Sequence, residues 1–327
     1  MTETSISAPD PLLYDVRLPI QHTFYPMGFP VKLYTNSEQI HQAALEAWGQ
    51  DELTFPGEAI QLRFAVEAGK ETGRPPARLP RGQGNLYSAI HSADNYAIAD
   101  FSRGFAYGWF TPAMICDRWY FRYHFLEALA YAVLSVRYLA PIHAACVGLR
   151  EAGLLLCGPS GAGKTSLAYA CARRGWEYIS DDGSYLVRKS QDARLIVGRP
   201  HHIRFRESAR TLFAELASRE SCRRANGKMD IEISSSEAGI KLVSSQIRAA
   251  AVVFLNRDGE SSPRLRPFSK DRARELLNQT VCLGEEPVRQ AQRESIDKFL
   301  EVPVLQLTYS GLEDAERSLR SFLEEKV

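Results

Sequence analysis

The sequence is poor in the features that mark several specialised classes of protein. Its six cysteines stand singly at positions 116, 146, 157, 171, 222 and 282, and the absence of any Cys-x-x-Cys pair disfavours both zinc-binding and disulfide frameworks. Charge of one sign is not in excess, since 40 Lys and Arg residues are balanced by 39 Asp and Glu residues. A near-neutral chain offers no bulk electrostatic attraction to nucleic acid or to an acidic membrane surface.

Long apolar runs are lacking as well. The opening segment MTETSISAPDPL is polar and has neither the basic start nor the apolar run of a secretory signal. The most apolar helical stretch, Phe125 to Leu139, is interrupted by Glu127 and Arg137 and is too short to span a bilayer. We therefore expect a cytoplasmic protein that has no membrane partner.

The chain does contain ample core material, because 45% of its 327 residues are hydrophobic. The order of its patterns predicts two domains, an N-terminal β-rich α+β domain over residues 1–138 and an α/β domain over residues 139–327. A tail or surface arm is expected over residues 1–25. The other elements predicted before residue 139 are strands at 29–34 and 60–66, a helix at 38–49, an antiparallel meander of strands at 86–91, 96–101 and 104–110, and a long buried helix at 116–139.

A basic loop containing Arg74, Arg78 and Arg81 lies beside the aromatic strands, an arrangement that also occurs in platforms for single-stranded nucleic acid. The charges are few, and aromatic residues in strands mostly pack their own sheet. We therefore favour a structural role for this region and expect no nucleic-acid partner.

The stretch from Leu154 to Asp182 carries the clearest chemical signal. A short apolar strand, LLLC, is followed by GPSGAGKT, which matches the phosphate-binding pattern G-x-x-x-x-G-K-[ST], and then by a helix, SLAYACARRG. Backbone N–H groups of such a loop cradle an anion at the positive end of the helix, and its lysine neutralises the outer phosphates. The threonine hydroxyl is a ligand of the kind that Mg²⁺ takes. The predicted nucleotide-binding residues are Gly158, Pro159, Ser160, Gly161, Ala162, Gly163, Lys164, Thr165 and Ser166.

Two adjacent carboxylates, Asp181 and Asp182, follow the next predicted strand, at 176–179. The carboxyl ends of strands are where open α/β sheets collect their ligands, and one acidic residue there holds the metal in phosphate-loop proteins. The second carboxylate is either a general base that accepts a proton from an attacking hydroxyl or a turn residue. A turn at the end of the strand would let both side chains point at one site.

The spacing of these groups resembles the HPr kinase/phosphorylase family, whose kinase fold is shared by phosphoenolpyruvate carboxykinase. His143 precedes Gly158 by 15 positions, and the Asp pair follows Lys164 by 17 and 18 positions. The resemblance implies a phosphate-loop kinase domain over residues 139–327. It also implies that Lys164 and Thr165 hold phosphate and Mg²⁺, and that Asp181 is the metal partner and Asp182 the base, with His143 beside them.

The chain departs from that family after the Asp pair. The run Leu-Glu-Ile-Arg-Gly-Leu-Gly, which supplies a glutamate and an arginine near the metal, is replaced by GRPHHIRFRES. Arg204 and Arg206 of this segment could face phosphate, but exposure on an edge strand is the commoner fate of such residues. The chain is therefore more similar to the divergent HPr-kinase-related kinases of bacterial peptide modification, and HPr itself is not named as its substrate.

The remaining patterns complete the second domain. They predict a hairpin of strands at 185–188 and 194–197, a short helix at 210–217, a buried strand at 249–255, helices at 270–278, 287–300 and 312–325, and a strand at 302–307. The polar segment SRESCRRANGKMD, at 218–230, is either a substrate or lid loop or an ordinary solvated loop.

The expected activity is that of an ATP- and Mg²⁺-dependent kinase that phosphorylates a serine or threonine hydroxyl on a small protein or peptide. Two alternatives stay open from the sequence. One is a kinase of a small-molecule hydroxyl, and the other is a nucleotide-binding regulator or scaffold that does not transfer phosphate. The sequence is also compatible with a homo-oligomer.

Overall fold

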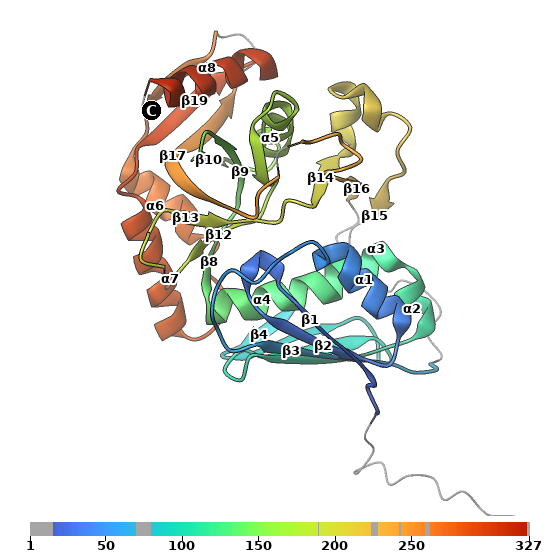
Figure 1. Cartoon of the computed structure of the whole chain (residues 1–327). Helices are drawn as coiled ribbons and strands as arrows, with labels where there is room; N and C mark the ends of the chain where they lie inside the picture. Colours follow the sequence, from blue (N-terminus) through green and yellow to red (C-terminus); the bar gives the residue numbers. More distant parts are fainter. Residues whose placement is uncertain are drawn as a thin grey trace, which may run out of the picture.

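The protein is described by a computed structural model that covers residues 16–69, 80–188, 190–223, 228–241, 243–258 and 262–325. These residues form a mixed α/β chain with three sheets, which confirms the predicted class at that level (Figure 1). Arg74 and Arg78 of the basic loop, for which a structural role was expected, lie outside the described residues, as do residues 1–15 of the predicted tail.

A seven-stranded mixed sheet forms the lower part of the molecule in Figure 1. Its strand order is β1-β2-β3-β7-β6-β5-β4, with β3 parallel to both β2 and β7 and all other neighbours antiparallel. The strands are β1 (Ile20–Phe24), β2 (Val31–Thr35), β3 (Ile60–Val66), β4 (Arg81–Gln83), β5 (Leu86–Ile90), β6 (Tyr96–Asp100) and β7 (Phe105–Phe110). The meander predicted from aromatic strands is confirmed, whereas residues 20–24 form an edge strand and not the predicted arm.

Helices cover one face of this sheet and separate it from the upper part of the molecule. They are the 3-10 turn η1 (Pro26–Gly28), α1 (Glu38–Trp48), α2 (Pro112–Cys116), α3 (Arg118–Phe121), the π-helical segment η2 (Arg122–Glu127) and α4 (Ala128–Arg137). The single long helix predicted over 116–139 is wrong at its start. Asp117 leaves helical geometry at φ −80° and ψ 73°, and its side chain accepts a hydrogen bond from the backbone N–H of Tyr120 and so caps α3.

A nine-stranded sheet forms the centre of the upper part. Its order is β11-β9-β10-β17-β13-β12-β8, with β19 beside β17 and β18 beside β19. The strands are β8 (Leu139–Ile142), β9 (Ala144–Leu149), β10 (Ala152–Cys157), β11 (Glu177–Ser180), β12 (Ser184–Val187), β13 (Leu195–Val197), β17 (Gln246–Arg257), β18 (Arg264–Pro267) and β19 (Val304–Tyr309). The predicted β12–β13 hairpin is confirmed.

Helices cover both faces of the nine-stranded sheet. Successive side chains of a strand point to opposite faces, so an apolar strand needs cover on both. Leu154 and Leu156 of β10 pack with α5 (Lys164–Arg173) and α8 (Leu312–Glu324), whereas Leu155 and Cys157 pack with α6 (Lys270–Asn278) and α7 (Glu286–Phe299). Because both of its faces are covered, the sequence of β10 is a continuous apolar run. Among the residues that the structure describes, no helix has the length and hydrophobicity needed to cross a membrane.

A small third sheet stands beside α5 and contributes to the site described below. It contains β14 (His202–Arg206), β15 (Cys222–Arg223) and β16 (Met229–Ser234) in the order β14-β16-β15. The helix predicted at 210–217 is replaced by two 3-10 turns, η3 (Glu207–Thr211) and η4 (Ala214–Leu216).

The predicted domain boundary after residue 138 falls between the two large sheets. Tyr185, Val187 and Val197 of the second region nevertheless belong to the same hydrophobic cluster as α4 and the seven-stranded sheet. The division into two domains therefore stays a prediction.

Candidate active site

The predicted phosphate loop joins the buried strand β10 to helix α5. Because β10, β17 and β19 are parallel, their carboxyl ends meet at one edge of the sheet, and the loop lies at that edge. Tyr309 at the end of β19 braces the loop, since its hydroxyl donates a hydrogen bond to the Ala162 carbonyl at 2.9 Å. Gly163 has φ 93°, and a Cβ there would lie 2.4 Å from the same hydroxyl. Glycine is therefore required at this position for two separate reasons.

Lys164 begins α5 and folds its side chain back over the loop. Its ammonium group donates hydrogen bonds to the carbonyl oxygens of Gly158 at 2.9 Å and Pro159 at 3.4 Å. Burial lowers the pKa of Lys164, and the nearby Asp182 carboxylate partly opposes that effect. Above the loop there is room for a ligand, because a Cβ added to Gly161 would meet no atom within 4 Å.

Asp181 and Asp182 lie in a bend directly after β11, as the sequence predicted. The bend is tied to the sheet by buried hydroxyls, since those of Ser180 and Ser184 lie 2.7 Å apart and Ser184 also donates to the Ala144 carbonyl at 2.9 Å. This bend allows two consecutive side chains to reach one cavity.

The two carboxylates have different surroundings. Asp181 is 3% exposed and accepts a hydrogen bond from the backbone N–H of Arg204 at 2.7 Å. Burial raises the pKa of Asp181, while Arg199 and Arg204 oppose that shift. The side chain of Asp182 is 44% exposed and lies 3.2 Å from Nδ1 of His143.

His143 reaches Asp182 from the short connection between β8 and β9. Its side chain is 48% exposed. Burial of part of the ring lowers the pKa of His143, against the opposite effect of the Asp182 carboxylate. The lowered pKa favours the neutral imidazole, whose Nδ1 faces the Asp182 carboxylate at 3.2 Å.

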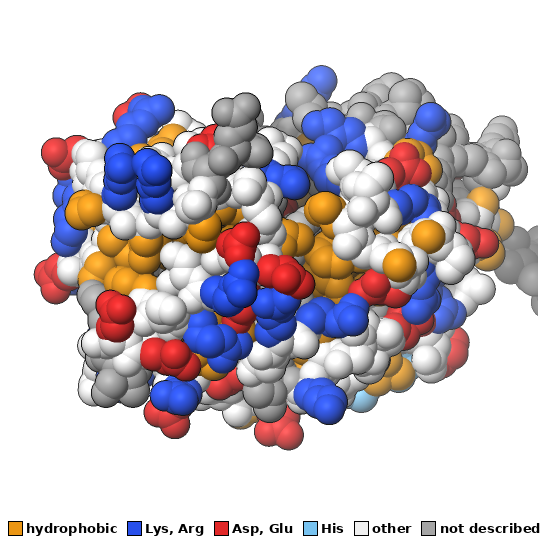
Figure 2. All heavy atoms as spheres, turned by 90° about the horizontal axis from the view of Figure 1, so that it is seen from above, with side chains coloured by type: hydrophobic (Ala, Val, Ile, Leu, Met, Phe, Trp, Pro, Cys, Tyr) orange, Lys and Arg blue, Asp and Glu red, His pale blue; other side chains and the backbone are white. Residues whose placement is uncertain are grey.

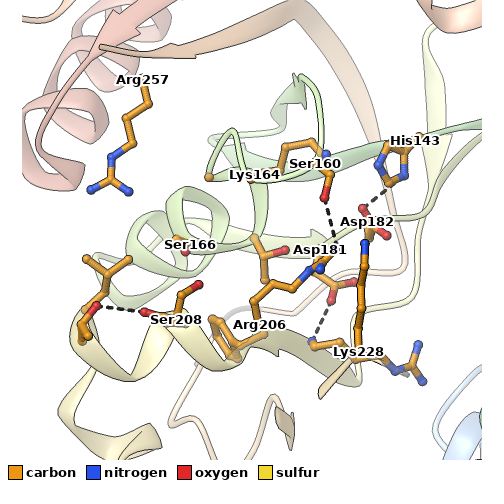
Figure 3. A pocket seen from close by; sticks show the side chains of 18 of the residues that line it. His143, Ser160, Lys164, Ser166, Asp181, Asp182, Arg206, Ser208, Lys228 and Arg257 are labelled. Carbon is orange, nitrogen blue, oxygen red and sulfur yellow. Dashed lines mark hydrogen bonds and ion pairs between the residues drawn. The ribbon is translucent and has the colours of Figure 1, made fainter. Parts of the chain in front are cut away.

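These groups line one cavity of about 540 Å³ (Figure 3). His143 and Asp182 point toward each other at one side of the phosphate loop, and Arg257, at the end of β17, lies on its other side. Six of the nine predicted loop residues line the cavity: Ser160, Gly161, Gly163, Lys164, Thr165 and Ser166. The other three lie in the loop itself, and two of them supply the carbonyl groups that hold Lys164.

Basic side chains from the small third sheet and its neighbours complete the lining. Arg206 donates a hydrogen bond to the Ser160 hydroxyl at 3.0 Å, and Arg199 and Arg204 lie near Asp181. Figure 2 shows one face of the molecule, with basic side chains near its middle and acidic side chains directly beside them.

A buried ionic network lies behind the cavity, and the sequence did not predict it. Arg204 donates to both carboxylate oxygens of Glu127, at 2.9 and 3.1 Å, and to Glu232 at 2.6 Å. Arg122 donates to Glu127 at 2.5 Å and also pairs with Glu232. Arg204 is 9% exposed, so the expectation that it is a surface charge on an edge strand is wrong. The network joins the π-helical segment η2 to β14 and β16, beside the backbone group that holds Asp181.

The sequence pattern and the structure agree on which residues come together. His143, Lys164, Thr165, Asp181 and Asp182 share one cavity. Sequence reasoning missed Tyr309 and the Arg204 network, because their signals are single residues far from the loop along the chain. The predicted lid segment at 218–230 is described only in part, and of its described residues Lys228 lines the cavity.

Comparisons with known proteins add only a distant relationship. No protein-family model matches the chain, and no curated protein matches it either. Among solved structures, the HPr(Ser) kinase/phosphatase from Coxiella burnetii matches over 56% of this chain and 98% of its own, with 16% sequence identity and a TM-score of 0.31. It belongs to the family that the sequence resembles, but so low a score carries no argument about function.

Proposed function

We propose that the protein is an ATP- and Mg²⁺-dependent kinase that transfers the γ-phosphoryl group to a serine or threonine hydroxyl of a small protein or peptide. One observation carries the proposal: the phosphate loop with Lys164 and the pair His143–Asp182 face the same cavity of about 540 Å³. Phosphoryl transfer depends mainly on positioning and charge stabilisation, so a cradle, a metal ion and one base are sufficient.

The loop residues fit a nucleoside triphosphate. The N-terminus of α5 and the backbone N–H groups of the loop favour an anion, and the space above Gly161 is open to one. Among the described residues, the hydrogen bonds of the Lys164 ammonium group go to neutral carbonyl groups of its own loop. A phosphate oxygen would be a stronger partner for the ammonium group than these carbonyls are.

The residues also fit Mg²⁺ that arrives with the nucleotide. The described part of the chain contains no group of three or more His, Cys, Asp or Glu side chains placed to hold a metal ion on its own. Mg²⁺ typically takes one or two protein carboxylates together with substrate phosphates and water. Asp181 and the Thr165 hydroxyl would hold it, and the ion would neutralise charge that develops on the phosphates.

Asp182 is the better placed carboxylate for the acceptor. Asp181 is buried and fixed by a backbone N–H, whereas Asp182 is about half exposed and touches His143. A serine or threonine hydroxyl entering from the exposed side would donate its proton to Asp182, and His143 would orient that carboxylate. The exposed position of the pair favours an acceptor on a protein or peptide over a small molecule enclosed in the cavity.

The test uses the whole protein, Mg²⁺ and γ-labelled ATP, with lysate and the proteins encoded by neighbouring genes as acceptors. Asp182→Asn should abolish label transfer while nucleotide affinity stays within about threefold of the wild type, because the base acts on the acceptor. Equal label transfer by wild type and variant would refute the assignment of Asp182. Tight nucleotide binding without transfer by the wild type would favour the regulator or scaffold instead.

A further inference from the structure

A second cavity, larger than the first, lies between the two large sheets. Its volume is about 790 Å³, which is in the range of small-molecule sites. Its walls come from the segment before β3, the end of α4, the end of β12 and the start of α7. None of the residues proposed for phosphoryl transfer lines it.

The walls of this cavity are mainly apolar and aromatic. Phe29 is stacked between Phe55 and Tyr138, with ring centroids 4.9 and 4.8 Å apart. Val136, Val187 and Val288 add aliphatic surface. An apolar body with one flat ring would therefore replace water here with favourable contacts.

Arg188 at the wall forms no ion pair with any residue that the structure describes. Arg188 donates a hydrogen bond to the Val136 carbonyl at 2.5 Å, and its Nε has no hydrogen-bond partner among the described residues. Burial lowers the pKa of Arg188, and neither Glu58 nor Glu285, which also line the cavity, offsets that effect. A half-buried cation without a carboxylate is costly, so an anion in the cavity would be stabilised beside it.

Arg137 lines the same cavity and provides the contrast. It pairs with Glu58 at 2.6 Å and also donates to the Ser102 carbonyl at 2.8 Å. Its charge is therefore already compensated within the chain. Of the two arginines at this wall, only Arg188 is left to recognise an anionic ligand.

We propose that this cavity is a second ligand site, which takes a small organic carboxylate with an apolar, preferably aromatic, body. The carboxylate pairs with Arg188 and the body packs against Phe55 and Tyr138, the two rings that enclose the buried Phe29. The apolar walls and the Arg188 cation together favour this class of ligand, because a nucleotide or a sugar phosphate would leave many of its polar groups unpaired against Phe55, Tyr138 and Val288.

The site is connected to the phosphoryl-transfer site by a two-stranded ladder. Strand β8 begins after Tyr138, at the second cavity, and ends next to His143; β12 begins just after Asp182 and ends at Val187, in the cavity wall. The two strands pair along their full length, from Leu139 with Val187 to Ile142 with Ser184. Each has four residues, about 13 Å. A ligand that moves Tyr138 and Val187 therefore acts on the His143–Asp182 pair.

Binding is tested by calorimetry with the whole protein and 3-phenylpropionate as the probe. Saturable binding is expected, weakened about tenfold or more by Arg188→Gln and by replacing the probe with uncharged 3-phenylpropanamide. Arg137→Gln is the matched control and should change the affinity by less than about twofold, because that arginine is already paired. Val288→Trp, which places an indole in the cavity wall and leaves Arg188 unchanged, should weaken binding about tenfold or more even if Arg188→Gln proves unstable.

The coupling is followed in the same samples by the NMR signals of the His143 imidazole, which are assigned with His143→Gln. Addition of 3-phenylpropionate should shift them in the wild type and not in Val288→Trp. Absence of saturable binding, or equal affinity of wild type and Arg188→Gln, would overturn the site. Saturable binding that leaves the His143 signals unchanged would overturn the coupling. Neither result depends on kinase activity, so failure of the proposed function is distinguished from failure of this inference.

Discussion

Glu127 offers a quantitative test of the buried network behind the candidate active site. It is 3% exposed, accepts hydrogen bonds from Arg122 and Arg204, and lies 3.7 Å from Arg199. Replacing it with Gln keeps the shape of the side chain and removes a negative charge that all three arginines share. We expect Glu127→Gln to be strongly destabilising, because the buried Arg122 and Arg204 and the partly buried Arg199 would lose this carboxylate.

The magnitude follows from the pKa of Glu127. Burial alone raises it, but Arg204, Arg122 and Arg199 outweigh burial and bring the pKa from its ordinary value of 4.5 down to about 2. One pKa unit is worth roughly 1.4 kcal/mol, so the ionised carboxylate contributes about 3 kcal/mol to the folded state at neutral pH. The cost of breaking a buried ion pair, about 3–5 kcal/mol, is similar.

The assay is urea unfolding of wild type and Glu127→Gln between pH 4 and 7. Because the pKa is depressed on folding, the contribution is complete above pH 4.5 and is lost as the pH falls toward 2. The difference between the two proteins should therefore be constant from pH 7 to about pH 5 and begin to shrink below pH 4.5. Glu58→Gln is the matched control, since Glu58 pairs with Arg137 at 2.6 Å with its side chain 76% exposed. If Glu127→Gln costs no more than this control, which should lose less than about 1 kcal/mol, the reasoning is wrong.

Three further predictions concern the loop and the core beneath it. Gly163→Ala should weaken nucleotide binding by about tenfold or more, since its Cβ would lie 2.4 Å from the Tyr309 hydroxyl, and Tyr309→Phe in the same chain should recover part of that loss in a fluorescent-nucleotide titration. Lys164→Met should weaken nucleotide binding in the same titration by a similar factor. The urea midpoint should change little, because the hydrogen bonds of the lysine go to carbonyl groups of its own loop. Glu316→Ala should cost about 2–3 kcal/mol in urea unfolding, because the buried indole N–H of Trp176, which donates to Glu316 at 2.7 Å, would lose its acceptor.

The strand, loop and helix of the predicted phosphate loop could be predicted from the sequence because their determinants are local. The apolar run of β10, the glycines, Lys164 and the helix that follows are consecutive in the chain, and each has a direct conformational consequence. The placement of His143 and the Asp pair could also be predicted, because short connections hold them at the ends of strands in the same sheet as β10. The spacing of these residues in the sequence therefore determines where they lie relative to the loop.

The network around Arg204 could not be predicted in this way. Arg204 lies 77 positions from Glu127 and 28 from Glu232, and its alternation on β14 is equally consistent with an exposed residue. Only the packing of the π-helical segment against the third sheet turns it inward. The break at Asp117 had a local signal, because aspartate is a good helix N-cap, but the long apolar pattern around it hid that signal.

The different surroundings of Asp181 and Asp182 arise from parts of the chain that are distant in sequence. Asp181 is covered by β14, whose Arg204 N–H holds its carboxylate, and β14 is held in turn by the pairs that Arg204 makes with Glu127 and Glu232. Asp182 faces the β8–β9 connection and meets His143. The helical region of the first part of the chain therefore stabilises the buried carboxylate, whereas the ladder that runs from the second cavity positions the exposed one. A change in the network should alter metal and nucleotide binding, and a ligand in the second cavity should alter the residue that faces the acceptor.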